Sequence, residues 1–89
     1  MADYAVSWSA RAARDMDRMD DKVVGAVIDL VYGSLAANPA RQGHRLRFEL
    51  EGHYSARRGG WRVIYRVDEA ARVVCIEQVG HRSDIYRLR

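Results

Sequence analysis

The chain has one cysteine, one proline and no apolar stretch of about 18 residues. One cysteine cannot form an internal disulfide, so a reducing compartment is expected. The missing apolar run excludes a transmembrane helix, and the start of the chain lacks the basic and apolar parts of a secretion signal. We therefore expect a soluble, cytoplasmic protein without a membrane partner.

Metal and nucleotide motifs are also missing: the sequence has no Cys/His spacing of a zinc site and no glycine-rich phosphate loop. No metal or cofactor is therefore expected. Lysine is almost absent, because 14 of the 15 basic residues are arginine and Lys22 is the exception. The planar guanidinium suits bidentate contacts with phosphate, although a GC-rich genome would also favour arginine codons.

The positive charge is concentrated in the second half of the chain. Residues 1–40 carry four basic and six acidic side chains, a balance of −2, whereas residues 41–89 carry eleven and six, a balance of +5. A length of 89 residues and a mass of 10.2 kDa allow one domain, which we place at residues 1–89. The basic half favours a polyanionic partner, nucleic acid before membrane.

The stretch Tyr54–Asp68 alternates around a glycine pair, Gly59 and Gly60, and predicts a β-hairpin. Glycine tolerates positive φ at both central positions, which suits a tight two-residue turn. Such a turn places Arg57 directly opposite Arg62. One face of the hairpin then carries Tyr54, Ala56, Trp61, Val63, Tyr65 and Val67 for burial under helices, and the other carries Ser55, Arg57, Arg62, Ile64 and Arg66.

Two arginines opposite each other repel, and like charges that face each other across a strand pair are normally destabilising. The pairing of Arg57 with Arg62 is therefore best explained by an anion between them, and phosphate is the first candidate. The alternative is that both are solvated surface charges. A longer turn would move Arg57 out of line with Arg62.

Hydrophobic periodicity predicts the remaining elements, with Ser9 and Asp20 suited to cap two helices. In chain order they are a strand over Tyr4–Trp8, a helix over Ala10–Met19, a helix from Asp21 to Asn38-Pro39, a loop over 40–45, a strand over Leu46–Glu51, the hairpin, and an inner strand over Arg72–Val79. This order predicts an α+β fold, in which a two-helix hairpin packs on one face of a largely antiparallel sheet of three to four strands. The other face is expected to be open and basic.

Three blocks of sequence carry a resemblance to a known family. They are Leu46-Arg with Leu50-x-Gly52, the hairpin block Ser55-Ala-Arg-Arg-Gly-Gly-Trp-Arg-Val-Ile-Tyr65, and the C-terminal block Val79-Gly-His-Arg-Ser-Asp-Ile-Tyr86. Together they resemble the RelE/ParE superfamily of bacterial toxins, and most closely its RelE branch. The resemblance implies a compact toxin that is neutralised by an antitoxin encoded beside it.

Two activities are implied by this resemblance. RelE-branch members cleave messenger RNA in the ribosomal A site without metal, so the ribosome and translated mRNA are implied partners, and translation is inhibited. ParE-branch members inhibit DNA gyrase on the same fold, and fold alone does not separate the two. A third reading is a basic RNA-binding module without catalysis.

The resemblance also implies site residues for an endoribonuclease. Arg57 and Arg62 resemble the basic residues of the family's hairpin, and Arg82 and Tyr86 resemble its C-terminal pair. The three arginines would stabilise the phosphate, with Arg82 also placed to assist the leaving group. Tyr86 would stack on a base or orient the attacking hydroxyl, and the alternative is that it packs the tail onto the sheet.

The sequence departs from the family where several RNase members carry a hairpin lysine, because Ser55 stands at that position. The general base is therefore missing from the expected place. Histidine exchanges protons near neutrality, so His81 is the first candidate for acid or base work, with a structural role as the alternative. His44 and His53 rank below it.

Overall fold

Five strands form one sheet in the order β1-β5-β4-β3-β2 in the computed structural model of the chain, which describes residues 3–46 and 52–83. The strands are β1 Ala5–Trp8, β2 His44–Arg45, β3 Tyr54–Arg58, β4 Trp61–Asp68 and β5 Val73–His81. β1 runs parallel to β5, and the other neighbours are antiparallel. The α+β prediction is confirmed, and the sheet has five strands instead of three or four because the short β2, which the sequence does not predict, adds a strand at one edge.

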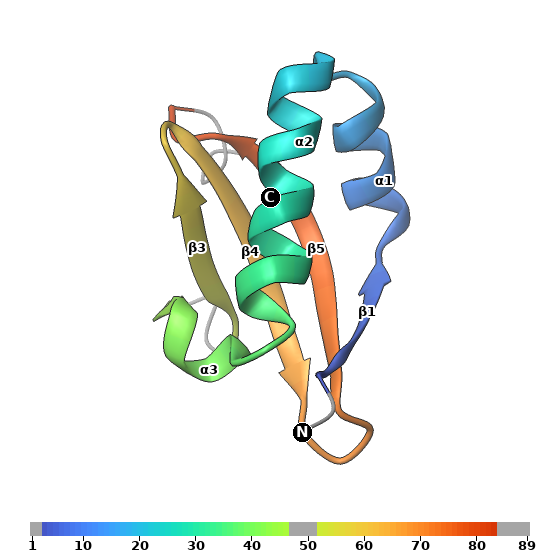
Figure 1. The fold of residues 1–89 in the computed structure, drawn as a ribbon, viewed down its shortest axis with the longest axis vertical. Helices are drawn as coiled ribbons and strands as arrows, with labels where there is room; N and C mark the ends of the chain where they lie inside the picture. The colour runs from blue at the N-terminus through green and yellow to red at the C-terminus, as the bar shows by residue number, and fades with distance from the viewer. Residues whose placement is uncertain (1–2, 47–51, 84–89) are drawn as a thin grey trace.

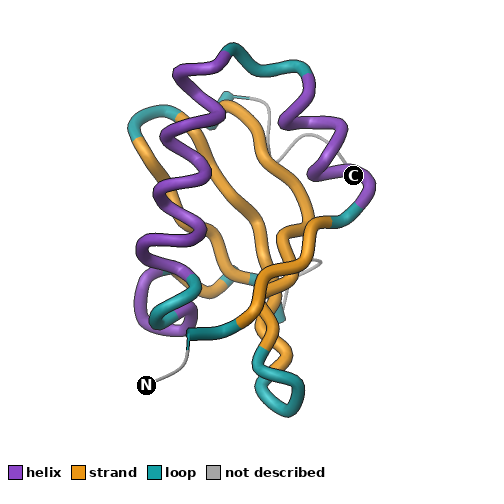
Figure 2. The backbone as a smooth tube through the Cα atoms, turned by 45° about the vertical axis from the view of Figure 1, so that its right-hand side comes forward, coloured by secondary structure: helices purple, strands orange, loops and turns teal. Residues whose placement is uncertain are grey.

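Helices cover one face of this sheet (Figures 1 and 2). They are α1 Ala10–Asp17, α2 Asp21–Leu30, a π-helical turn η1 Val31–Leu35, and α3 Pro39–Gln42. Both predicted caps are present: Ala12 N–H donates to Ser9 Oγ at 2.9 Å, and Val23 N–H donates to Asp20 Oδ1 at 3.1 Å. Within the described residues, no helix is long and apolar enough to span a membrane.

The predicted loop over 40–45 is wrong, because helix α3 and strand β2 occupy most of it. Pro39 begins α3 as well as closing the preceding helical segment. Proline is tolerated in the first turn of a helix, where its missing N–H has no intrahelical partner. The predicted strand Leu46–Glu51 lies largely in residues 47–51, outside the described residues.

The core lies between the helices and the sheet face that they cover. Its buried residues are Ala12, Val27, Leu30, Val31, Leu35, Ala56, Val63, Tyr65, Val74, Ile76 and Val79. Three of them, Ala56, Val63 and Tyr65, come from the hairpin face that the sequence assigns to burial, and Tyr54 and Val67 pack against them. The choice of buried face is therefore confirmed.

Tyr65 fixes the β2 edge of the molecule to the core. It is fully buried, its hydroxyl donates to Pro39 O at 2.6 Å, and its ring stacks on Tyr54 at 5.4 Å between centroids. Burial raises the pKa of Tyr65, so the hydroxyl remains a donor. A Cβ at Gly43 would collide with this hydroxyl, so the chain needs glycine there to pass from α3 into β2.

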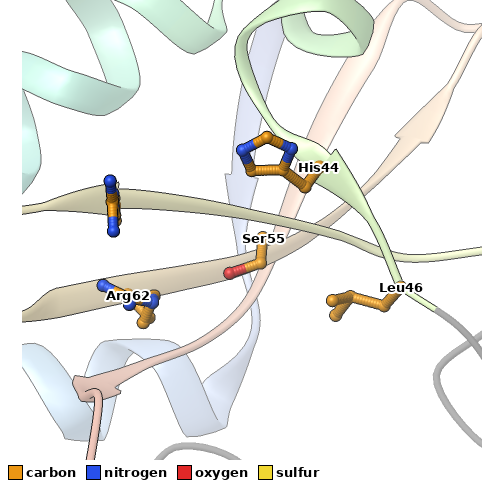
Figure 3. A pocket seen from close by; sticks show the side chains of 5 residues that line it. His44, Leu46, Ser55 and Arg62 are labelled. Atoms are coloured by element: carbon orange, nitrogen blue, oxygen red, sulfur yellow. The ribbon is translucent and has the colours of Figure 1, made fainter.

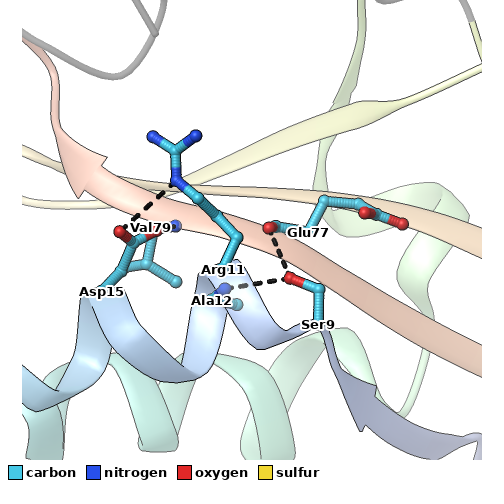
Figure 4. A network of polar contacts seen from close by, with 6 residues as sticks. All are labelled: Ser9, Arg11, Ala12, Asp15, Glu77 and Val79. Carbon is cyan, nitrogen blue, oxygen red and sulfur yellow. Dashed lines mark hydrogen bonds and ion pairs between the residues drawn. The ribbon is translucent and has the colours of Figure 1, made fainter. Parts of the chain in front are cut away.

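Helix α1 holds β5 at an irregular point of the sheet (Figure 4). Tyr65 pairs with Ile76 but Ile64 pairs with Gln78, so Glu77 is an extra residue on β5. Such a bulge disrupts the ladder hydrogen bonds. Side chains of the helix segment supply partners: Val79 N–H donates to Asp15 Oδ2 at 2.9 Å, and Ser9 Oγ donates to Glu77 O at 2.7 Å.

Replacing Asp15 with alanine should destabilise the protein by about 1–3 kcal/mol, because the partly buried N–H of Val79 loses its acceptor. Asp15→Asn keeps an acceptor and should lie between the parent and Asp15→Ala. Urea denaturation measures the effect, and Asp17→Ala, an exposed position on the same helix, is the matched control. Equal midpoints for Asp15→Ala and Asp17→Ala would contradict the role of this contact.

Candidate functional site

The hairpin has the register that the sequence predicts. Arg57 pairs with Arg62, Ser55 with Ile64, and Arg58 with Trp61 across a two-residue turn. Of the two turn glycines only Gly59 has a positive φ, 61°, which matches the primed turn with glycine at its first central position. Gly60 is required for space instead, because a Cβ there would lie 2.9 Å from His81 Nε2.

We call the sheet face that carries Ser55, Arg57, Arg62, Ile64 and Arg66 the arginine face. The expectation of an open face is wrong over its middle, where Ile64 is 0% and Ser55 6% exposed. Part of the reason is β2, whose His44 lies directly opposite Ser55. Arg57 is exposed and Arg62 half-buried, so access remains at the end of the hairpin near its turn.

A pocket of about 230 Å³ opens on the arginine face. His44 and Leu46 line it from the β2 side, Ser55 and Arg57 from β3, and Arg62 from β4. Figure 3 shows His44, Ser55 and Arg62 turned toward the same space from three successive strands. Two guanidinium groups, one imidazole and one hydroxyl therefore converge on a space large enough for a phosphate and part of a nucleotide.

Three buried polar atoms of the described residues have no hydrogen-bond partner: Arg62 Nη1, His53 Nδ1 and Gln78 Oε1. All three belong to the arginine face. Gln78 pairs with Ile64, and His53 lies two residues before Ser55 in extended chain, so its side chain points to the same side of the sheet. Unpaired buried polar atoms are costly and rare in folded proteins. The unpaired donor of Arg62 therefore makes this pocket chemically suited to an anion.

No group of three or more His, Cys, Asp or Glu side chains gathers as metal ligands within residues 3–46 and 52–83. Arg66, the remaining arginine of this face, is paired: its Nε lies 2.8 Å from Glu77 Oε2. This contact raises the pKa of Arg66 through the hydrogen bond and the charge of Glu77. Among the described residues of the arginine face, the cations available to a ligand are therefore Arg57 and Arg62.

Arg82 lies at the same end of the sheet as the arginine pair. Its side chain is exposed, and its backbone N–H donates to Gly60 O at 2.8 Å, which holds it beside the hairpin turn. Tyr86 falls outside the described residues. The structure thus brings Arg57 and Arg62 together and places Arg82 close to the turn that joins their strands.

His81 points to the opposite side of the sheet. It pairs with Trp61, whose ring it meets edge-on at 5.4 Å and 90°, and Trp61 shares the covered face with Val63. Its Nδ1 lies 2.9 Å from Ser83 Oγ. His81 is therefore separated from the pocket by the sheet, and its proposed chemistry has no support from this placement.

His44 is the imidazole that the fold brings to the arginine pair, and the sequence ranks it below His81. The signal that could have found it is alternation: His44 and Leu46 are two residues apart, so a strand that begins at His44 puts both on one face. A predicted loop over 40–45 hides this alternation.

The sequence matches the family model described as ParE toxin of type II toxin-antitoxin system, parDE, over residues 6–86. It is also similar to two curated proteins of Mycobacterium tuberculosis. It is 42% identical to toxin RelG over 84 residues, covering 94% of this chain and 97% of the relative. It is 44% identical to toxin RelE over 85 residues, covering 96% and 88%.

Solved structures show the same likeness. The toxin–antitoxin complex RelBE2 from Mycobacterium tuberculosis contains a chain with a TM-score of 0.87 and 39% identity, covering 94% of this chain and 97% of that one. The isolated Escherichia coli RelE toxin has a TM-score of 0.74 at 22% identity, covering 94% and 92%, which is a likeness of fold alone.

Gly60→Ala should destabilise the protein by about 1–3 kcal/mol, because the new methyl group meets the His81 ring at 2.9 Å. His81→Ala should cost about 1 kcal/mol through the lost contact with Trp61. The double variant should lose less than the sum of the two, because removing the ring removes the clash. Thermal denaturation of the four proteins measures this coupling, and strictly additive losses would contradict the placement of His81.

Proposed function

The chain belongs to the ParE toxin family of type II toxin–antitoxin systems, within the RelE/ParE superfamily, and on that premise we propose that this toxin is a metal-independent endoribonuclease that cleaves translated messenger RNA in the ribosomal A site. The observation that carries the proposal is the pocket of the arginine face, where Arg57 and Arg62 stand opposite each other and Arg62 Nη1 has no partner among the described residues.

The chemistry of RNA cleavage explains why two arginines would share one pocket. The 2′-oxygen attacks the adjacent phosphorus, and negative charge accumulates on the phosphate oxygens in the transition state. Donors that already point at those oxygens lower the barrier because they need no reorganisation. Arg57 and Arg62 are held by a strand pair, so their backbone positions are fixed before the substrate arrives.

Arg82 and Tyr86 complete the proposed site. The bond from Arg82 N–H to Gly60 O keeps Arg82 beside the hairpin turn, and in the proposed reaction its side chain would assist the leaving oxygen. Tyr86 would stack on a base next to the scissile bond, as aromatic side chains do for splayed RNA. Its role rests on the sequence alone.

We expect the ribosome to position the RNA, because the pocket is too small to do so by itself. About 230 Å³ is below the roughly 300–1,000 Å³ of typical small-molecule sites, so it holds one phosphate with its neighbours. Alignment of an attacking oxygen needs further contacts, which the decoding site would provide.

A second candidate is inhibition of DNA gyrase, and the observation that favours it is the matching family model, which describes a ParE toxin. This activity would need a protein-binding surface and no cleavage chemistry. It predicts that toxicity survives the loss of Arg62.

Arg62→Ala should abolish toxicity and lower the rate of mRNA cleavage by about 10²–10³-fold, because the phosphate loses a stabilising donor. Primer extension on translated messages measures the cuts, and circular dichroism confirms the fold. Arg14→Ala, an exposed arginine on α1, is the control for loss of charge elsewhere. Full growth arrest by folded Arg62→Ala would reject the endoribonuclease, and inhibition in a gyrase supercoiling assay would then support the second candidate.

Purified toxin should cut naked RNA far more slowly than the same message on ribosomes, because the ribosome supplies the alignment. The measurement compares single-turnover cleavage of one message, free and bound to ribosomes with an open A site. Equally fast cuts in phase with codons on free RNA would show that the ribosome is not needed.

The proposed antitoxin, encoded beside the toxin, would cover the arginine face with acidic residues. Solved relatives include toxin–antitoxin complexes, which supports such a partner. The double variant Arg57→Glu/Arg62→Glu should weaken the complex and change its salt dependence, because two attractive charges become repulsive. Calorimetry with the neighbouring gene product tests this, with Arg14→Glu/Arg18→Glu as the matched charge control. Equal affinities for both double variants would place the antitoxin elsewhere.

A further inference from the structure

The proposed cleavage lacks a general base among the residues assigned so far. Guanidinium groups stay protonated in proteins, so Arg57 and Arg62 stabilise charge but do not accept a proton. Ser55 is not a base at neutral pH. The only lysine, Lys22, lies on α2 in the helical layer. Among the described residues, the candidate to take the proton of the 2′-hydroxyl is therefore another side chain of the pocket.

His44 occupies the position that this step requires. It lies on β2 directly opposite Ser55, and it lines the pocket together with Arg57 and Arg62 (Figure 3). Ser55 and Arg57 are two residues apart on β3. His44, which lies opposite Ser55, is therefore displaced from the pair of Arg57 and Arg62 by roughly 6.6–6.8 Å along the strands. A phosphate on the arginines would leave its neighbouring ribose on the side of His44.

Among the residues that the structure describes, the groups around His44 leave it as the available proton acceptor. Arg57 on β3 and Arg62 on β4 face it across the pocket. Arg45, its neighbour on β2, points to the other side, where its guanidinium lies 5.9 Å from the centre of the Tyr54 ring. The carboxylate of Glu77 on β5 is paired with Arg66. His53, which directly precedes β3, is half-buried and does not line the pocket.

We propose, on the basis of the function proposed above, that His44 is the general base of the cleavage reaction. Its neutral imidazole takes the proton of the 2′-hydroxyl while the 2′-oxygen bonds to phosphorus. The bond from phosphorus to the 5′-oxygen breaks, and that oxygen leaves with the electron pair and takes a proton from water. The products are a 2′,3′-cyclic phosphate and a 5′-hydroxyl, and the imidazolium returns its proton to solvent.

The test is single-turnover cleavage of ribosome-bound message by the parent, His44→Gln and His44→Ala. Glutamine keeps much of the size and polarity of histidine but accepts no proton, so we expect a rate loss of about 10²–10⁴-fold. The side chain of His44 is exposed on an edge strand, so both variants should remain folded. Added imidazole should restore part of the rate to His44→Ala and none to His44→Gln, which retains a side chain in the space.

The dependence of the rate on pH provides a second readout. A base must be neutral to act, so the parent rate should rise with pH while the imidazolium loses its proton and then level off. In His44→Gln the plateau should disappear, because hydroxide replaces the lost base and the rate keeps rising. The pH profile of the parent tests the proposal even if substitutions at position 44 unfold the protein. A parent rate that shows no plateau overturns the proposal.

His53→Gln is the matched comparison, since it changes the same residue type on the same face outside the pocket. It should retain the plateau and lose less rate than His44→Gln. The reverse order of effects overturns the assignment of His44 and leaves the endoribonuclease intact. Unchanged cleavage by folded His44→Gln overturns it in the same way. If the parent makes no cuts in translated message, the proposed function itself fails, and this inference fails with it.

Discussion

The register of the β3–β4 hairpin is the constraint on which the fold and the site both depend. Side chains alternate along a strand, so a slip of one residue would turn Val63 and Tyr65 to the arginine face and Arg62 into the core. Burial of Val63 and Tyr65, which are 1% and 0% exposed, therefore also fixes Arg57 opposite Arg62. The apolar face sets the position of the charged pair.

The strands on either side of the hairpin are each held by a separate set of contacts. On one side the Tyr65 hydroxyl binds Pro39 O, which anchors the segment that leads into β2 and His44. On the other, Asp15 binds Val79 N–H beside the bulge of β5, which leads on to Arg82. Groups from three parts of the chain meet at one end of the sheet because both of its flanks are fixed to the same core.

Three buried polar atoms of the arginine face have no partner among the described residues, and this has an energetic consequence. An unpaired donor such as Arg62 Nη1 lowers the stability of the free toxin, and a phosphate or an antitoxin carboxylate that pairs with it would stabilise the folded state. A domain of 89 residues buries a small core and is expected to be marginally stable. Binding of such a partner at this face would therefore be coupled to the stability of the fold.

The sequence by itself determined the features that depend on local rules. Alternation and the Gly59-Gly60 turn gave the pairing of Arg57 with Arg62, and side-chain chemistry gave the caps at Ser9 and Asp20. Only the tertiary structure decided which histidine reaches the pocket. His81 and His44 stand on strands whose faces are set by pairing with Trp61 and Ser55, and such pairings join residues far apart in the chain. Local patterns carry no information about these partners.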